Sequence, residues 1–201
     1  MLPALLLIDL QNDFLDESTL APTKDYVVRG AANLLGLCRS EKIPVVHIWT
    51  TVREDSDRMP HWRRENKWAC VEGSHGHATP ELLKPDHSEK IIHKKFFSAF
   101  TVPDLKQYLV EFKADTLILC GVHTHACIQT TAVDAYSNGY SVLIAEDAVA
   151  SFDPEAGALA RRFMHNRIGQ FLPFEALREM LHNVPSSIEP PGSPPRRVPD
   201  L

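Results

Sequence analysis

The sequence predicts an α/β fold in which a mostly parallel sheet carries helices on both faces. Near-continuous apolar runs, which are typical of strands buried on both faces, occur at 4–8, 44–49, 116–120 and 140–145. Helical patterns lie between these runs, so helix and strand alternate along the chain. The chain of 201 residues, 44% of them hydrophobic, is long and apolar enough for one buried core, which predicts a single domain.

The sequence after the first predicted strand indicates a helix, two further strands and one long polar stretch. Apolar residues at spacings of three and four predict an amphipathic helix, and they are Val27, Val28, Ala31, Leu34, Leu35 and Cys38. Two weaker runs, at 89–92 and 168–172, predict two further strands and bring the sheet to six. The stretch 52–88 is polar and has no clear period, which is typical of a lid, a binding loop or a partner surface, or of a tolerated insertion.

The end of the chain differs in composition from the rest. Six prolines after residue 183 prevent a helix there and disfavour a central strand. We therefore divide the chain into one domain over 1–183 and a Pro-rich tail over 184–201, which is extended or packs on a neighbour.

Charge and cysteine content exclude several classes of protein. With 21 basic and 26 acidic residues and a net charge of −5, the chain has no basic stripe, so we expect neither nucleic acid nor an anionic membrane as a partner. No apolar run approaches the roughly 18 residues of a membrane span, and the first residues lack signal-peptide features, which predicts a cytoplasmic protein. The 4 cysteines form no C-x-x-C pair and are expected to be reduced thiols.

Reactive residues follow three of the predicted strands, where the ligands of parallel sheets bind. Asp9 ends the first strand, and a carboxylate at such a place is costly unless it is paired or used. Lys94 and Lys95 follow the strand at 89–92. Cys127 lies in the first turn of a predicted helix that has Thr124 as its N-cap, a position that should lower the pKa of the thiol.

Each of these residues also has a purely structural interpretation. Cys127 alone can be a buried helix cysteine, as we expect for Cys38 and Cys120 among their leucines. Asp9 alone can be a turn carboxylate, and a lysine at a strand end is commonly a solvated charge. Together, however, the nucleophile, the base and the cation predict thiol catalysis.

Three motifs carry a family resemblance. They read LLLIDLQNDF, HKKFFSAF and GVHTHACIQTTAVDAYSNGY, and they resemble those of the isochorismatase-like cysteine hydrolases. The resemblance implies a three-layer αβα fold with a six-stranded, mostly parallel sheet in the order 3-2-1-4-5-6. It also implies a catalytic triad of Cys127, Asp9 and Lys94. Lys94 is preferred to Lys95 because the family lysine stands four positions before the serine of S-A-F, which is Ser98 here.

The implied reaction is hydrolysis of a small-molecule amide or carbamoyl C–N bond through a thioester. Asp9 takes the thiol proton, Lys94 favours the thiolate, and the backbone N–H groups of His123 and Cys127 hold the oxyanion. The family commonly has a cis peptide between the residues that match Val122 and His123, and its members are often dimers or tetramers, so we expect a homo-oligomer. Alternative interpretations are a vinyl-ether hydrolase of the isochorismatase type and a non-catalytic scaffold.

Cofactor and pocket residues are less constrained by the sequence. The Asp-x-His-x-x-His metal motif of nicotinamidases is absent from 49–61, and the pairs His75/His77 and His123/His125 have no third ligand at a useful spacing, so we expect no metal and no cofactor. For the substrate pocket, the candidates are Phe14, Trp49, His61 and Trp62. A subunit contact or plain solvation is an equally good interpretation of the residues in the stretch 52–88.

Overall fold

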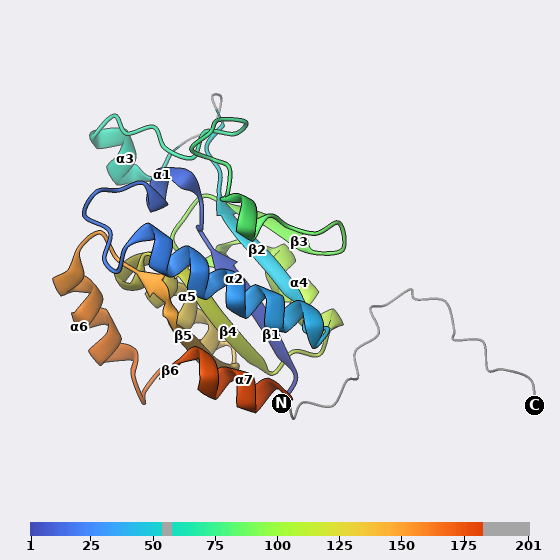
Figure 1. Cartoon of the computed structure of the whole chain (residues 1–201). Coiled ribbons are helices and arrows are strands. Elements are labelled where there is room, and N and C mark those ends of the chain that lie inside the picture. The colour runs from blue at the N-terminus through green and yellow to red at the C-terminus, as the bar shows by residue number, and fades with distance from the viewer. Residues whose placement is uncertain (54–57, 183–201) are drawn as a thin grey trace, which may run out of the picture.

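A parallel sheet of six strands forms the centre of the molecule in the computed structural model, which describes residues 1–53 and 58–182 (Figure 1). The strands are β1 Pro3–Ile8, β2 Val45–Thr50, β3 Lys90–Lys94, β4 Thr116–Val122, β5 Ser141–Ala150 and β6 Gln170–Leu172. All six predicted strands are therefore present. The Pro-rich tail predicted over 184–201 lies outside the described residues.

The strand order is β3-β2-β1-β4-β5-β6, as the family resemblance implies. All the pairings are parallel, and Ile8 at the end of β1 lies between Ile48 of β2 and Gly121 of β4. From β1, the chain adds β2 and β3 on one side of the sheet and then β4, β5 and β6 on the other. The carboxyl ends of β1 and β4 therefore flank the topological switch point where such sheets bind their ligands, with the end of β2 beside them.

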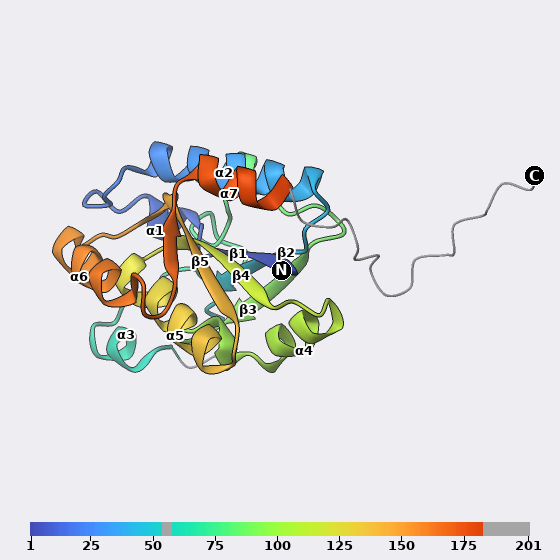
Figure 2. The same cartoon turned by 90° about the horizontal axis from the view of Figure 1, so that it is seen from below.

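Helices cover both faces of the sheet. They are α1 Asn12–Leu15, α2 Lys24–Ser40, α3 Pro60–Arg64, α4 Pro103–Glu111, α5 Gln129–Ser137, α6 Pro154–Met164 and α7 Phe174–His182. Three shorter turns of helix are η1 Glu81–Leu83, η2 Ala99–Thr101 and the π-helix η3 Thr124–Ile128. Helices α2 and α7 lie on one face, and α4, α5 and α6 lie on the other (Figure 2). The molecule therefore has the predicted three layers.

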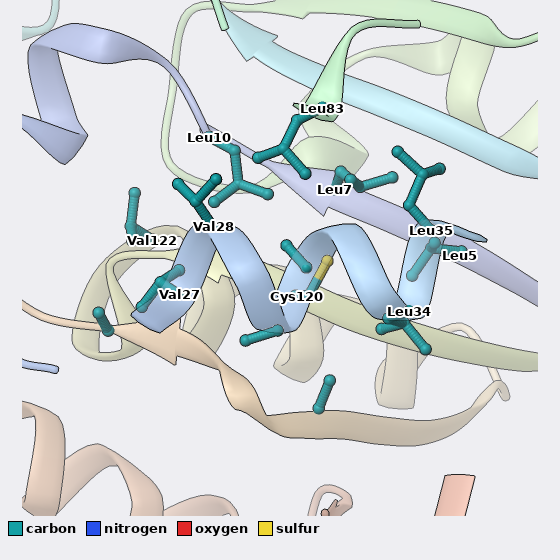
Figure 3. Close-up of a cluster of buried hydrophobic side chains, with 14 of the residues drawn as sticks. Leu5, Leu7, Leu10, Val27, Val28, Leu34, Leu35, Leu83, Cys120 and Val122 are labelled. Carbon is teal, nitrogen blue, oxygen red and sulfur yellow. The ribbon is translucent and has the colours of Figure 1, made fainter. Parts of the chain in front are cut away.

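Successive side chains along each strand point to opposite faces of the sheet, and they pack into two separate hydrophobic cores. Leu5 and Leu7 of β1 pack under α2 with Cys120 of β4 (Figure 3), whereas Leu6 and Ile8 face α4 and α5. The predicted helical stripe is the buried face of α2. Cys38 and Cys120 are fully buried in the α2-side core, which agrees with their interpretation as inert core residues.

The described part of the stretch 52–88 is a packed part of the domain. Residues Met59, Trp62, Ala69 and Leu83 join the α2-side core, and α3 lies beside α1 through a ring contact between Phe14 and Trp62. The apolar residues of the stretch 52–88 are widely spaced among polar ones, so they form no period that the sequence analysis could detect. Over 1–53 and 58–182, none of the helices is long and apolar enough to span a bilayer.

Candidate active site

Four buried side chains meet at the switch point. Asp9 follows β1, Thr50 and Lys94 end β2 and β3, and Cys127 lies in η3 directly after β4. The exposed fractions of the whole residues are 1% for Asp9, 1% for Thr50, 2% for Lys94 and 6% for Cys127. Asp9 adopts a left-handed conformation with φ 54°, which Asp tolerates better than most residues, and this conformation ends the strand.

Lys94 connects the other three side chains. Its ammonium donates to Asp9 Oδ2 at 2.7 Å, to Thr50 Oγ1 at 2.8 Å and to Cys127 Sγ at 3.5 Å. An ammonium has three N–H groups, so each of them has an acceptor. The structure therefore brings together the three residues of the predicted triad, and it does so through Lys94 rather than Lys95.

Burial and charge set the protonation of the site. Burial alone would lower the pKa of Lys94, but the negative charge of Asp9 and the hydrogen bonds of the ammonium outweigh burial and raise it, so Lys94 is an ammonium. The pKa of Cys127 is also raised, first by burial and then by the negative charge of Asp9, which Lys94 offsets only in part. The predicted lowering of this pKa is therefore wrong, and the resting sulfur is a protonated thiol.

The helix that carries Cys127 begins differently from the prediction. The π-helix η3 has His123 as its N-cap with no side-chain cap bond, and Thr124 is its first residue. The Thr124 hydroxyl donates instead to the carbonyl of Ala150 at 3.2 Å and so ties η3 to β5. The peptide between Val122 and His123 is cis, as the family resemblance implies.

Gln11 and Thr50 belong to the site but were missed by the sequence analysis. The Gln11 amide is fully buried, donates to the carbonyls of Thr50 at 3.0 Å and His77 at 2.9 Å, and accepts the Thr50 backbone N–H at 2.9 Å. Gln11 thereby fixes the ends of β1 and β2 to each other. Neither residue type carries a sequence signal of its own at a strand end.

Three of the four predicted pocket residues lie in one aromatic group. Ring contacts join Phe14 to Trp62 at 6.3 Å, Trp62 to His61 at 6.0 Å and Phe14 to His123 at 5.6 Å. Trp49 is not in this group, because side chains alternate along β2 and the next residue, Thr50, faces Lys94. The Trp49 ring contacts those of His77 and His93 instead.

His123 is a buried neutral histidine beside the triad. Burial, reinforced by the proximity of His125, lowers its pKa to about 4. Its Nδ1 is buried and has no hydrogen-bond partner among residues 1–53 and 58–182, and its Nε2 lies 3.9 Å from Glu17 Oε2. An unpaired lone pair is tolerated better than an unpaired N–H, so we assign the proton to Nε2.

Protonation of His123 should make folding pH-dependent. Its pKa is about 4 in the folded protein against 6.5 for an ordinary histidine, so the unfolded chain takes up the proton first as the pH falls, and stability is lost between these two values. We expect the free energy of unfolding to fall by about 2 kcal/mol more in the wild type than in His123→Phe between pH 7 and pH 5. Urea unfolding at both pH values measures this difference, and equal losses in the two proteins would contradict it.

Metal ligands do not gather in the part of the chain that the structure describes. There, no group of three or more His, Cys, Asp or Glu side chains is arranged to hold a metal ion. A member of each candidate pair has another polar neighbour: His77 Nε2 lies 2.9 Å from Thr51 Oγ1, and His125 Nδ1 lies 2.8 Å from Ser151 Oγ. The absence of a cofactor stays a prediction.

The fold and this buried site together define a doubly wound α/β protein with a cysteine, an aspartate and a lysine at its switch point. The Isochorismatase domain family matches residues 3–175, and the chain therefore belongs to the isochorismatase family. A Cys-Asp-Lys triad is characteristic of this family of hydrolases.

Individual relatives agree with this assignment. The chain is 31% identical to the maleamate amidohydrolase of Pseudomonas putida over 157 residues, which cover 73% of this chain and 71% of that protein. An isochorismatase family protein from Desulfovibrio vulgaris is 31% identical with a TM-score of 0.79, over 90% of this chain and 98% of that one. The nicotinamidase/pyrazinamidase PncA of Bacillus subtilis is 30% identical with a TM-score of 0.77, over 85% and 99%. The family thus includes amidases that act on C–N bonds.

Proposed function

We propose that this protein is a cysteine-dependent hydrolase of a small-molecule amide or carbamoyl C–N bond. The observation that carries the proposal is the buried contact of Lys94 Nζ with both Asp9 Oδ2 and Cys127 Sγ, at 2.7 and 3.5 Å. A nucleophile, a base and a cation in one buried group are the parts that thiol catalysis requires. The amidases among the relatives support the choice of a C–N bond.

The first half of the reaction forms a thioester. The S–H bond of Cys127 breaks, its proton passes to Asp9, and the sulfur attacks the carbonyl carbon of the substrate. The carbonyl oxygen becomes an oxyanion that accepts hydrogen bonds from the backbone N–H groups of His123 and Cys127, each worth about 3 kcal/mol. The C–N bond then breaks, and the amine leaves with the proton from Asp9.

The second half regenerates the enzyme. Water gives a proton to Asp9 and attacks the thioester carbon, and the C–S bond breaks as the carboxylic acid leaves. The sulfur recovers its proton from Asp9. Lys94 keeps its positive charge throughout, because the raised pKa holds it as an ammonium, and it stabilises whichever neighbour is negative.

The raised pKa of Cys127 requires a general base in this mechanism. A thiol that is protonated at rest is a weak nucleophile until its proton is removed, and Asp9 is the carboxylate that lies beside it. We also propose that Phe14, His61 and Trp62 contact the acyl part of the substrate. The ring contacts that join them and reach His123 support this placement.

Ammonia release from a panel of small amides, ureides and carbamoyl compounds tests the proposal. The wild type should release ammonia from at least one of them, and Cys127→Ser should lower the rate by about 10⁴-fold or more while its circular dichroism is unchanged. Cys120→Ala is the matched control, because Cys120 is buried in the other core and should affect stability alone. Equal release by wild type and Cys127→Ser would overturn the mechanism, and vinyl-ether hydrolysis retained by both would assign the alternative reaction.

A further inference from the structure

Thr50 makes three hydrogen bonds with Asp9 and Lys94 of the triad. Its hydroxyl donates to Asp9 Oδ1 at 2.8 Å and accepts from Lys94 Nζ at 2.8 Å, and its backbone N–H reaches the same Asp9 oxygen at 2.9 Å. The side chain is buried. One hydroxyl therefore joins the base of the triad to its cation.

These bonds make the two oxygens of Asp9 unequal. Each carboxylate oxygen has about two acceptor sites. Oδ1 accepts from the O–H of Thr50 and from its backbone N–H, which is shared with Gln11 Oε1. Oδ2 accepts from the ammonium of Lys94. Lys94 also donates to Cys127 Sγ, so Oδ2 and the sulfur share one hydrogen-bond donor.

We propose that Thr50 is a positioning residue whose hydroxyl makes Oδ2 of Asp9 the oxygen that receives the Cys127 proton. The hydroxyl holds the plane of the carboxylate so that the free acceptor site of Oδ2 faces the thiol. It also takes one N–H of Lys94, which leaves the remaining two for Oδ2 and for the sulfur. In the transfer, the S–H bond of Cys127 breaks, an O–H bond forms at Oδ2, and the thiolate keeps the hydrogen bond from Lys94.

The inference rests on the proposed function, because the proton it positions is that of the catalytic thiol. Thr50→Val removes the hydroxyl and keeps both the shape and the backbone N–H. Thr50→Ser keeps the hydroxyl. Thr51→Val is the matched control, because the Thr51 hydroxyl bonds the rings of His77 and His93 and does not belong to the triad.

Two readouts separate this role from a structural one. In ammonia release, Thr50→Val should lower kcat by about 100-fold with KM unchanged, since a misplaced base slows the chemical step and leaves substrate binding as it was. Thr50→Ser and Thr51→Val should keep kcat close to that of the wild type. The second readout is the rate at which iodoacetamide alkylates Cys127, followed by mass spectrometry with the other cysteines as internal references, and it should fall in Thr50→Val alone.

The outcomes distinguish the two proposals. A folded Thr50→Val with wild-type alkylation and kcat would overturn the role of Thr50. Slower alkylation in Thr50→Val and its rescue in Thr50→Ser would support that role even if the wild type released no ammonia, a result that would count against the proposed function alone. A loss of folded protein in Thr50→Val with normal kcat for the folded remainder would show a structural role and overturn the inference.

Discussion

Lys94→Met should abolish hydrolysis and also destabilise the fold. We expect kcat to fall by about 10⁴-fold, as for the loss of one member of a catalytic triad. We also expect the free energy of unfolding to fall by about 3 to 5 kcal/mol, because removing one partner of a buried ion pair leaves the other charge uncompensated. The Lys94 side chain is 0% exposed and lies 2.7 Å from Asp9, so the methionine leaves this carboxylate with Thr50 as its remaining hydrogen-bond donor among the described partners.

The matched control for this prediction is the next residue, Lys95→Met. Lys95 is partly exposed, and its replacement should change the free energy of unfolding by less than about 0.5 kcal/mol. Urea unfolding followed by circular dichroism measures stability, and ammonia release measures activity. A Lys95→Met protein that loses activity while Lys94→Met keeps it would contradict the placement of the catalytic lysine.

The sequence could predict the strands and the triad because both follow from local patterns. Apolar runs predicted six strands, and reactive residues after three of them predicted a shared site. The strand order came from the family resemblance, and the structure confirms it. The serine spacing that favoured Lys94 over Lys95 also agrees with the observed contacts.

What the sequence could not predict depends on packing and burial. The position of Cys127 near a helix N-terminus predicted a lowered pKa, but such a dipole effect is commonly about 0.3 to 1 kcal/mol, and the burial of the sulfur has the larger effect. Thr50 looks like any threonine at a strand end until β1, β2 and β3 lie side by side. Trp49 was expected at the pocket, and only the alternation along β2 shows that it faces the opposite side.

Gly121→Ala should be the most destabilising single-methyl change near the site. A Cβ at this position would lie 1.9 Å from the carbonyl oxygen of Ile8, and the residue has φ +127°, which L-residues rarely adopt. The obstacle is backbone in the centre of the sheet, between β1 and β4, and so it cannot move aside as a flexible side chain can. We expect a loss of more than about 4 kcal/mol in the free energy of unfolding, with little soluble protein.

Gly139→Ala is the matched control because it measures the cost of placing an alanine at a positive φ without a steric clash. Gly139 also has a positive φ, +86°, but nothing lies within 4 Å of its Cβ position, so its alanine variant should lose only about 1 to 2 kcal/mol. Urea unfolding of both variants measures the difference, which is the contribution of the close approach to Ile8. Equal losses in the two variants would show that conformation alone requires Gly121.

Any Gly121→Ala protein that folds should also have low activity, since Ile8 immediately precedes Asp9, and Gly121 precedes the segment that leads to Cys127. A methyl group that separates β1 from β4 therefore also separates the base from the nucleophile.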